Sequence, residues 1–586
     1  MQKAVREGGF FRVLQRRRNC DKIAPFNMER RMTIKDCLNR AAEESPDCIA
    51  LKFKADGRWQ TRSFRQLRER VWHVSEMLVE LGVQEGDRVA IYRENSPEWF
   101  ELYHGIVGIG AVAVPVDAKL RESEVRHIFR DCAVSVAFCS CRMAENLLEM
   151  KERIPELKHL VMLDCNERNA HLCEELECEM YGALFDAVHE KAMTDGRAFD
   201  RLSPSPASPA SFIYTSGTTG RQKGAVLTHR NFLANVESID RSLRFSKEDN
   251  FMLILPLHHS FAFTCTVLVP IFKHCQVSLV ESLKTIKADM ADASPTIMLA
   301  VPLLLDKMLA RVMDGVNAKK MARIMFNAGL AKVIGKKVKE GLGGKLRLVV
   351  SGGAPISPAT LEGWNKLGLL VVEGYGITET APVLSVNPLD APKVGTVGLP
   401  LKGVEIRIDK PNAEGIGEIC AKGDNVMQGY WNNPEETAKV LRDGWYHSGD
   451  LGRFDEDGYL VISGRKKSLI VNREGKNIYP EEVERQVLKS KLVLECLALG
   501  YREAEETGER VGLIVVPNQE IIDGMHTHEG ANLTDEVIEE LVRKDVREKL
   551  KALADYKRPR KIEVRFEEFE KTTTQKIKRY LYDISV

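Results

Sequence analysis

The run from Tyr214 to Gly224, YTSGTTGRQKG, constrains this chain more than any other segment. Its glycines let backbone N–H groups approach an anion closely, its hydroxyls add hydrogen-bond donors, and Lys223 adds a positive charge. Residues 211–215, directly before the glycines, are expected to form a strand. The run therefore predicts a loop that binds a polyphosphate.

The spacing excludes two common phosphate loops. A Walker A loop places lysine directly after its last glycine and Ser or Thr after the lysine, whereas here two residues separate Gly220 from Lys223 and a glycine follows. The dinucleotide pattern G-x-G-x-x-G is also absent. A flexible Gly/Ser/Thr surface loop is the alternative interpretation of the run taken alone.

Length and charge limit the classes of protein. A chain of 586 residues is too long for one core and predicts at least two domains. Its 44% apolar and 29% charged residues are ordinary for a globular protein, and 85 Lys plus Arg nearly balance 84 Asp plus Glu. No global field favours nucleic acid or an anionic membrane, so anion binding has to be local.

The thirteen cysteines show no disulfide-module spacing, which suits a reducing compartment and predicts a cytoplasmic location. The nearest approach to a metal pattern is Cys139 and Cys141 with His171, Cys173 and Cys178. Because the C-x₂-C pairs of structural zinc sites are missing, we do not predict zinc there.

Two segments resemble targeting or membrane sequences at first sight. Residues 1–31 carry nine Lys/Arg against three acids and lack an apolar run, so we expect a flexible extension rather than a secretory signal; an Arg-rich targeting segment is the alternative. Residues 251–272 are apolar, but they contain Pro256, Pro270 and two histidines, which are costly in lipid. A buried strand, turn and helix is expected there.

Helix and strand patterns alternate along the first part of the chain. Ser63 and Gln66 form a capping-box pattern before a helix that ends at Gly82, and Ser96-Pro97 starts another helix. Apolar strands are expected at 88–92, 111–116 and 348–351, the last running into Gly352-Gly353. This order predicts parallel sheets covered by helices.

Four further motifs follow the phosphate loop: EGYGITET at 373–380, GWYHSGD at 444–450, GRKK at 464–467 and TTTQKIK at 572–578. The five motifs, in this order, resemble the adenylate-forming superfamily of acyl-CoA synthetases, luciferases and peptide-synthetase adenylation domains. The resemblance runs from about Met32 to the C-terminus. Within the superfamily the chain is most similar to fatty acyl-CoA synthetases.

The resemblance implies an α/β fold with a large N-terminal domain of parallel sheets sandwiched by helices and a small, mobile α+β C-terminal domain. The expected boundaries are 1–31 for an N-terminal extension, 32–466 for the AMP-binding (adenylation) domain and 467–586 for the C-terminal domain, which carries the catalytic lysine.

The resemblance also implies an ATP site. Loop 215–224 would hold the β- and γ-phosphates, and Tyr375 would stack on adenine where glycines leave room. Asp450, in Ser448-Gly449-Asp450 at an expected loop, would accept both ribose hydroxyls. The alternative for Tyr375 is an ordinary core tyrosine. The alternative for Asp450 and Arg465 is that both are solvated turn residues. The implied ATP-binding residues are Thr215, Ser216, Gly217, Thr218, Thr219, Gly220, Lys223, Gly352, Gly353, Gly374, Tyr375, Asp450 and Arg465.

Three residues are implied in the chemistry. Thr378 would contact the α-phosphate, and Glu379 would bind the Mg²⁺ that bridges ATP oxygens. An N-capping acid on a following helix is the alternative for Glu379. Lys576 would bridge the attacking carboxylate and the α-phosphate, although Gln575 stands where relatives commonly carry glycine and a solvated basic tail is the alternative.

The resemblance also implies which residues serve the second half-reaction, in which CoA forms the thioester. The small domain would rotate about a hinge at Lys467 and bring in the loop 472–480, where Gly475 lets the pantetheine arm of CoA pass close to the backbone. His259 would lie beside the substrate carboxylate, and Phe263 would gate a hydrocarbon tunnel. A core histidine and a core phenylalanine are the alternatives for these two.

The expected activity is that of an acyl-CoA ligase that uses ATP, Mg²⁺ and CoA to activate a medium- to long-chain fatty acid through an acyl-AMP. A ligase for an aryl or alicyclic acid, an acyl-AMP ligase that loads a carrier protein, and a nucleotide- and acyl-binding protein without turnover are the alternatives. The expected partners are small molecules, with no nucleic acid and no transmembrane segment; peripheral membrane association stays open, and a monomer or homodimer is expected.

Overall fold

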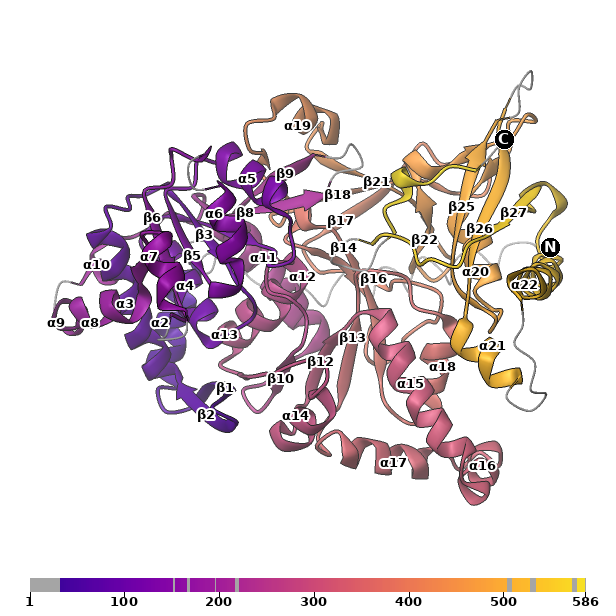
Figure 1. Cartoon of the computed structure of the whole chain (residues 1–586), viewed down its shortest axis with the longest axis horizontal. Coiled ribbons are helices and arrows are strands. Elements are labelled where there is room, and N and C mark those ends of the chain that lie inside the picture. Colours follow the sequence, from indigo (N-terminus) through magenta and orange to yellow (C-terminus); the bar gives the residue numbers. More distant parts are fainter. Residues whose placement is uncertain are drawn as a thin grey trace, which may run out of the picture.

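The computed structural model describes residues 32–150, 153–165, 169–194, 197–216, 221–502, 508–526, 534–571 and 577–584. The expected N-terminal extension, residues 1–31, lies outside the described residues. Figure 1 shows a large domain, coloured indigo to orange, and a separate smaller C-terminal lobe, coloured orange to yellow. The predicted division into a large α/β domain and a separate C-terminal domain is confirmed.

Three sheets form the framework of the large domain in the described part of the chain. A nine-stranded sheet has the order β16 (Leu399–Pro400), β15 (Val383–Val386), β14 (Val371–Gly376), β13 (Leu348–Ser351), β12 (Ile297–Ala300), β10 (Asn250–Leu253), β11 (Gln276–Leu279), β1 (Ile49–Ala55), β2 (Arg58–Ser63). An eight-stranded sheet has the order β19 (Gly429–Tyr430), β9 (Gln222–Thr228), β8 (Pro209–Ser216), β4 (Val112–Val116), β3 (Arg88–Tyr92), β5 (Val136–Cys139), β6 (His159–Met162), β7 (Glu179–Met180). The third contains β17 (Glu405–Asp409), β18 (Gly417–Lys422), β21 (Trp445–Phe454), β20 (Leu441–Arg442) and β22 (Leu460–Arg465).

The nine-stranded sheet is parallel at its centre and antiparallel at both edges, whereas the eight-stranded sheet is antiparallel only at the edge formed by β8, β9 and β19 and parallel through to β7. Helices connect and cover the strands (Figure 1). They are α2 (Ile34–Glu44), α3 (Phe64–Glu80), α4 (Pro97–Gly108), α5 (Glu122–Asp131), α6 (Ala144–Met150), α7 (Ala170–Glu175), α8 (Tyr181–Ala187), α9 (His189–Met193), α10 (Ala198–Arg201), α11 (His229–Leu243), α12 (Ser260–Phe263), α13 (Val269–Lys273), α14 (Ile286–Ala293), α15 (Pro302–Asn317), α16 (Lys320–Asn327), α17 (Ala331–Gly341), α18 (Pro358–Lys366) and α19 (Pro434–Val440).

The alternation of side chains along the strands explains the layers. In β3, Val89 and Ile91 face the central core, while Ala90 and Tyr92 face the core beneath α5 and α6. In β12, odd-numbered residues likewise join the central core and even-numbered residues pack toward α14 and α18. Strands buried on both faces need apolar side chains at every position, which the continuous apolar runs supply.

Local sequence patterns place several helix starts as expected. Ser63 caps α3 and exchanges hydrogen bonds with Gln66, and Ser96 caps α4 with Pro97 at its first position. Residues 251–272 form part of β10 and then α12, a π-helical turn (Thr264–Leu268) and part of α13, which confirms a buried strand, turn and helix. No helix among the described residues has the length and apolarity that crossing a bilayer requires.

One disulfide, Cys165–Cys173, lies in the described part of the chain. The cysteine spacing gave no reason to expect it, because its two members are only eight residues apart and belong to no disulfide-module pattern. Of the residues raised as a zinc alternative, Cys173 is therefore held in this bond.

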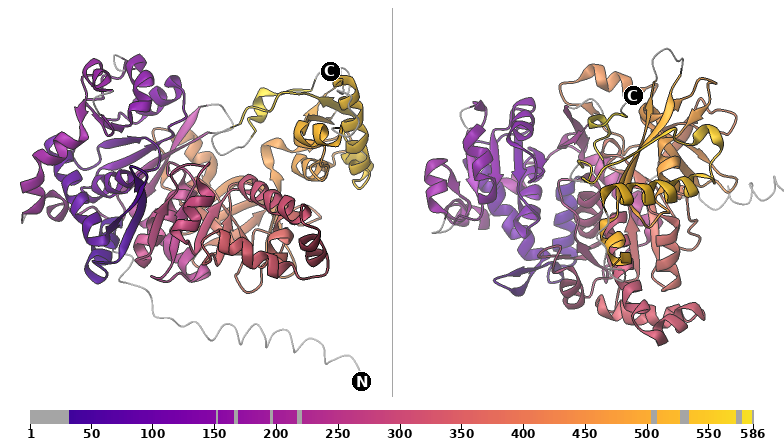
Figure 2. Two further views of the ribbon diagram at one scale, coloured as in Figure 1. Left: turned by 60° about the horizontal axis from the view of Figure 1, so that its bottom comes forward. Right: turned by 45° about the vertical axis from the view of Figure 1, so that its right-hand side comes forward.

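The smaller domain has its own core. Its elements are β23 (Ile470–Val471), β24 (Asn477–Ile478), β25 (Val493–Tyr501), β26 (Arg510–Pro517), β27 (Lys561–Val564), α20 (Pro480–Val487), α21 (Gln519–His526) and α22 (Asp535–Leu550). Along β26, Val511, Leu513 and Val515 pack toward α20 and α22, and the intervening Ile514 and Val516 pack on the opposite face. Figure 2 shows this lobe beside the large domain from two further directions. A core of this size supports the predicted α+β domain.

We predict that Glu373, buried on β14, makes stability depend on pH. Burial raises the pKa of Glu373 to about 7. This folded-state pKa exceeds the pKa of the same group in the unfolded chain. The free energy of unfolding is therefore highest below the unfolded-state pKa and decreases as pH rises toward 7. Glu373→Gln removes the penalty, so its melting temperature should exceed that of the wild type by roughly 2 °C at pH 8 and by little at pH 5.

Thermal unfolding at the two pH values tests this. The control is Glu362→Gln on the exposed face of α18, which should leave the melting temperature unchanged at both. An equal shift for Glu373→Gln at pH 5 and pH 8 would contradict the assignment.

Candidate active site

The carboxyl ends of neighbouring parallel strands define the site. Chain order reverses at β10, which has β11 on one side and β12 on the other, and such switch points leave a crevice at the carboxyl edge of a sheet. The segment 256–263 follows β10, Gly352-Gly353 follow β13, and Thr378-Glu379 follow β14. Ser260 Oγ lies 3.1 Å from Thr378 Oγ1, so segments more than a hundred residues apart meet here.

Tyr375, Asp450 and Arg465 form one hydrogen-bonded group. The Tyr375 hydroxyl donates to Asp450 Oδ2 at 2.7 Å, and Arg465 Nε lies 2.7 Å from Asp450 Oδ1. Asp450 is 5% exposed and pairs with Arg465 across β21 and β22. The expectation of a loop for Asp450 is wrong, because Gly449, at φ +71°, lets the chain continue as a strand through this position.

This group favours the functional interpretation of these residues over solvated turn positions. A buried carboxylate that binds both an arginine and a phenol is held in one orientation. Tyr375 is buried, and burial followed by the charge of Asp450 raises its pKa well above the ordinary value. The phenol therefore stays protonated and donates to Asp450, whose oxygens keep lone pairs for further donors.

Glu379 lies in a 3₁₀ turn, Thr378–Thr380, and is followed by β15 rather than by a helix. The N-capping alternative therefore does not apply. Tyr430 donates its hydroxyl to Glu379 Oε1 at 2.7 Å, and the Glu379 carbonyl accepts from Met427 N at 2.8 Å. A buried carboxylate with one oxygen held by a phenol suits a hard cation, since Mg²⁺ prefers oxygen ligands.

The phosphate loop connects two antiparallel strands, β8 and β9, which pair from Thr228 opposite Pro209 to Gln222 opposite Ser216. Gly217, Thr218, Thr219 and Gly220 lie outside the described residues, as does the side chain of Ser216. Thr215 is on β8 and half-buried, directly opposite Lys223. The loop therefore joins a hairpin, which separates it structurally from loops that begin a helix.

Lys223 is paired with a glutamate that lies outside the loop. Its Nζ lies 2.5 Å from Glu436 Oε2 on α19 and 4.9 Å from the centre of the Tyr430 ring. The hydrogen bond from Lys223 is the main reason why the pKa of Glu436 is held at about 2. A phosphate that bound Lys223 would have to compete with this carboxylate.

His259 lies beside another histidine. Its Nε2 is 3.0 Å from His258 Nε2, and His258 in turn is 3.4 Å from Asp117 Oδ2. Burial, with a smaller contribution from Lys119, lowers the pKa of His258 to about 3, so His258 is neutral near pH 7. Phe263, one turn further along α12, is fully buried in the central core.

The glycines differ in the space beside them. A Cβ on Gly352 would lie 2.9 Å from the Phe261 ring, and one on Gly374 would lie 3.3 Å from the Ser385 carbonyl oxygen. Gly353 has φ +85°, which favours glycine, and its nearest neighbour would be 3.9 Å away. A side chain would therefore meet open space at Gly353, whereas the Phe261 ring lies against Gly352.

The predicted hinge and CoA-loop positions lie at the start of the small domain. Lys467 lies in the 3₁₀ turn Lys466–Ser468 directly after β22, and Gly475 has φ +73° in a turn closed by its N–H to the Asn472 carbonyl. Beyond Gly475 itself and its two chain neighbours, no described residue has an atom within 4 Å of a Cβ placed on Gly475. Lys576 lies outside the described residues.

The sequence patterns did not identify Tyr430, Glu436 or Ser260. Tyr430 and Glu436 meet Glu379 and Lys223 only because β19 pairs with β9. Asn433-Pro434 is a helix-start pattern that could have placed Glu436 in the first turn of α19, but nothing in the sequence indicates which side chain it meets.

Comparison with known proteins agrees with this arrangement. The profile of the AMP-binding enzyme family matches residues 38–431, and that of the AMP-binding enzyme C-terminal domain matches residues 482–576. A long-chain-fatty-acid–CoA ligase of Salmonella typhimurium is 30% identical over 95% of each chain, and the long-chain-fatty-acid–CoA ligase FadD15 of Mycobacterium tuberculosis is 28% identical over 86% of this chain and 84% of the other. The crystal structure of ATP-bound MatB from Rhodopseudomonas palustris superposes with a TM-score of 0.71 at 27% identity, covering 94% of this chain and 98% of that chain.

The chain belongs to the AMP-binding enzyme family. It is an AMP-forming acid–CoA ligase, which confirms the prediction of an enzyme.

Proposed function

We propose that this ligase activates a medium- to long-chain fatty acid. ATP and the acid would form an acyl-AMP and pyrophosphate, and CoA would then form the acyl-CoA and release AMP. The observation that carries the proposal is the path of α12: Ser260, at its start, lies 3.1 Å from Thr378, and Phe263, at its end, is buried among apolar side chains. Helix α12 therefore leads from the site toward an apolar region suited to an alkyl chain.

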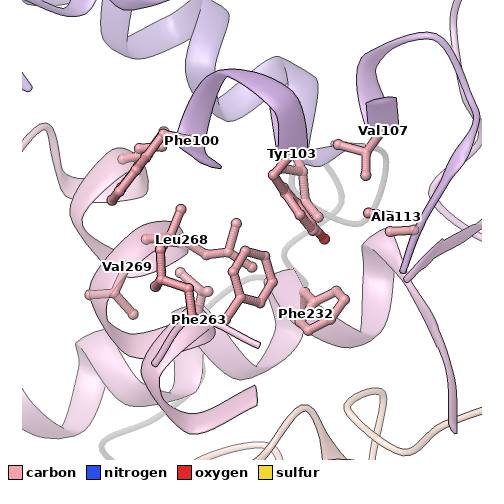
Figure 3. Packing of buried hydrophobic residues seen from close by; sticks show 14 of the residues in the cluster. Phe100, Tyr103, Val107, Ala113, Phe232, Phe263, Leu268 and Val269 are labelled. Carbon is pink, nitrogen blue, oxygen red and sulfur yellow. The ribbon is translucent and has the colours of Figure 1, made fainter. Parts of the chain in front are cut away.

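The surroundings of Phe263 support an alkyl substrate. Its ring centre lies 4.3 Å from that of Tyr103, 5.3 Å from that of Phe232 and 5.5 Å from that of Trp99. Figure 3 shows the rings of Tyr103 and Phe232 near that of Phe263, with the aliphatic side chain of Leu268 beside it. An ionised group would be costly in this environment, whereas methylene groups are stabilised there.

Phe263 would act as the gate of this region. Its ring fills the space in the structure, so an alkyl chain enters only when the ring moves. The π-helical turn Thr264–Leu268 follows it directly, and such turns often occur at functional sites because their hydrogen bonds can rearrange. His259 would lie beside the carboxylate of the acid.

The residues of the large domain would hold the nucleotide. Asp450 would accept the ribose hydroxyls, Arg465 would contact ribose and phosphate, and Tyr375 would lie against adenine. Thr378 would donate to the α-phosphate, and the Thr215–Lys223 loop would donate to the β- and γ-phosphates. Glu379 would hold Mg²⁺, whose charge would offset that of the triphosphate.

The small domain would adopt two orientations relative to this site, one for each half-reaction. The boundary between the two domains would lie between residues 466 and 467. The end of β22 at Arg465 and the change to a 3₁₀ turn at Lys466 support this boundary. Lys576 would serve adenylation, and the turn at Gly475 would serve CoA. We propose a cytoplasmic monomer or homodimer.

The acid and the acceptor can be tested together. AMP and pyrophosphate formation would be measured with ATP and Mg²⁺ over a series from acetate to oleate, plus benzoate, cyclohexanecarboxylate and malonate, with and without CoA. Malonate belongs in the series because a malonate–CoA ligase of Arabidopsis thaliana is 28% identical over 81% of this chain. CoA-dependent AMP formation that peaks on one alkyl length is expected.

A peak on benzoate, cyclohexanecarboxylate or malonate would reject the fatty-acid proposal. Pyrophosphate release that ignores CoA would favour transfer to a carrier protein.

Lys576→Ala should slow acyl-AMP formation by on the order of 10²-fold, because removal of one transition-state donor has an effect of this size. Acid-dependent pyrophosphate release measures it. The control is Lys578→Ala, a basic residue two positions away whose amine lies 3.7 Å from Glu570. Adenylation by Lys576→Ala at the wild-type rate would reject the role.

Lys467→Pro should leave acyl-AMP formation nearly unchanged and block thioester formation, because proline fixes φ at the pivot. The two half-reactions would be measured separately, by pyrophosphate release without CoA and by reaction of preformed acyl-AMP with CoA. Equal loss of both half-reactions would show that the substitution damages the site itself.

A further inference from the structure

A buried glutamate joins the nucleotide site to the proposed hinge. Glu418, on β18, is 8% exposed. Its Oε1 accepts from the Gly449 N–H at 3.1 Å, and its Oε2 accepts from Lys466 Nζ at 2.9 Å. Gly449 directly precedes Asp450, and Lys466 directly follows Arg465. One carboxylate therefore connects the turn that presents Asp450 with the residue before Lys467.

This contact is the second of two successive attachments. Arg465 is ion-paired with Asp450, and Lys466 is ion-paired with Glu418, so the last two residues before Lys467 are each bound to a buried carboxylate of the large domain. β22 pairs with β21 up to Arg465 and then ends. Beyond that point the side chain of Lys466 supplies an attachment to the third sheet.

The groups around Glu418 favour its ionised form, which its ion pair with Lys466 requires. Burial acts to raise the pKa of Glu418, but the hydrogen bond and charge of Lys466, together with the Gly449 N–H, hold this pKa below its usual value. His447 Nδ1 at 3.5 Å and an Arg442 nitrogen at 4.0 Å also face the carboxylate. Asp409, Glu418 and His447 could offer ligand atoms within 4.8 Å of one another, but Lys466 already supplies the cation that Glu418 needs.

We propose that Glu418 is a positioning residue that binds Lys466 to the large domain, so that rotation of the small domain starts at Lys467 and leaves Arg465 in place on Asp450. This inference rests on the proposed two-step function. Without the pair, the chain can separate from the sheet before residue 467, and the pivot is no longer fixed. The loop at Gly475 then reaches the acyl-AMP in fewer of the available orientations.

The two half-reactions should respond differently. ATP and the acid bind to the large domain, and adenylation needs one lysine from the small domain. Thioester formation needs a longer surface, the loop 472–480, to be placed along the path of CoA, and it is therefore more sensitive to the orientation of the small domain.

Lys466→Met removes the charge from a side chain that is 57% exposed but leaves the buried Glu418 without its nearest cation, so thermal unfolding is measured alongside the two half-reactions. We expect ATP affinity and acyl-AMP formation within about twofold of wild type, and reaction of preformed acyl-AMP with CoA at least about tenfold slower. Lys466→Arg restores the ion pair and should recover most of the lost rate. Glu418→Gln keeps an acceptor for Gly449 but loses the charge, and it should reproduce the defect of Lys466→Met.

The matched control is Lys393→Met, which removes another lysine paired with carboxylates, Asp455 and Asp457, away from the hinge. It should change neither half-reaction. Wild-type rates of both half-reactions in Lys466→Met, or equal loss of both that Lys466→Arg does not recover, would overturn the inference. Failure of the wild type to form acyl-AMP from any acid would instead reject the proposed function.

Discussion

The burial of parallel strands on both faces is the constraint on which the rest of the structure depends. The two large sheets share a central core, and each also packs against an outer set of helices. Strands such as β3 and β12 therefore have no face on which a polar group can meet solvent. Chemically active residues are confined to the strand ends and to the connections that leave them. Thr378, Glu379 and Ser260 occupy such positions, and helix α12 leads from one of them into the central core.

The third sheet places the remaining polar groups against this edge. Asp450 and Arg465 lie opposite each other on β21 and β22, and Asp450 also accepts from Tyr375 of the nine-stranded sheet. Glu418 on the adjacent β18 repeats this arrangement one residue further along with Lys466. Each carboxylate is buried and has a cationic partner, which is the condition under which a charge can be held inside a protein. On the proposed function, nucleotide binding and domain rotation would thus depend on neighbouring ion pairs in one small sheet.

Local sequence patterns predicted several helices and strands correctly, because helix caps and apolar runs depend only on residues that are close in the sequence. Several patterns predicted elements at the positions where the structure has them. They are the capping box at Ser63 and Gln66, the proline at the start of α4, and the apolar runs of β3 and β13. Asp450 was expected in a loop because Ser448-Gly449 reads as a turn. The strand continues there because pairing with β22 outweighs the local preference for a turn.

The sequence by itself determined the order of helices and strands, the family, and the identity of the motif residues, because these depend on side-chain chemistry and short-range spacing. Only the tertiary structure decided which side chains meet. Tyr430 binds Glu379, Glu436 binds Lys223, Phe261 fills the space beside Gly352, and Glu418 binds Lys466, in each case through strand pairings or helix packing between distant segments. Such contacts depend on the register and order of strands in a sheet, and no local pattern in a single sequence contains that information.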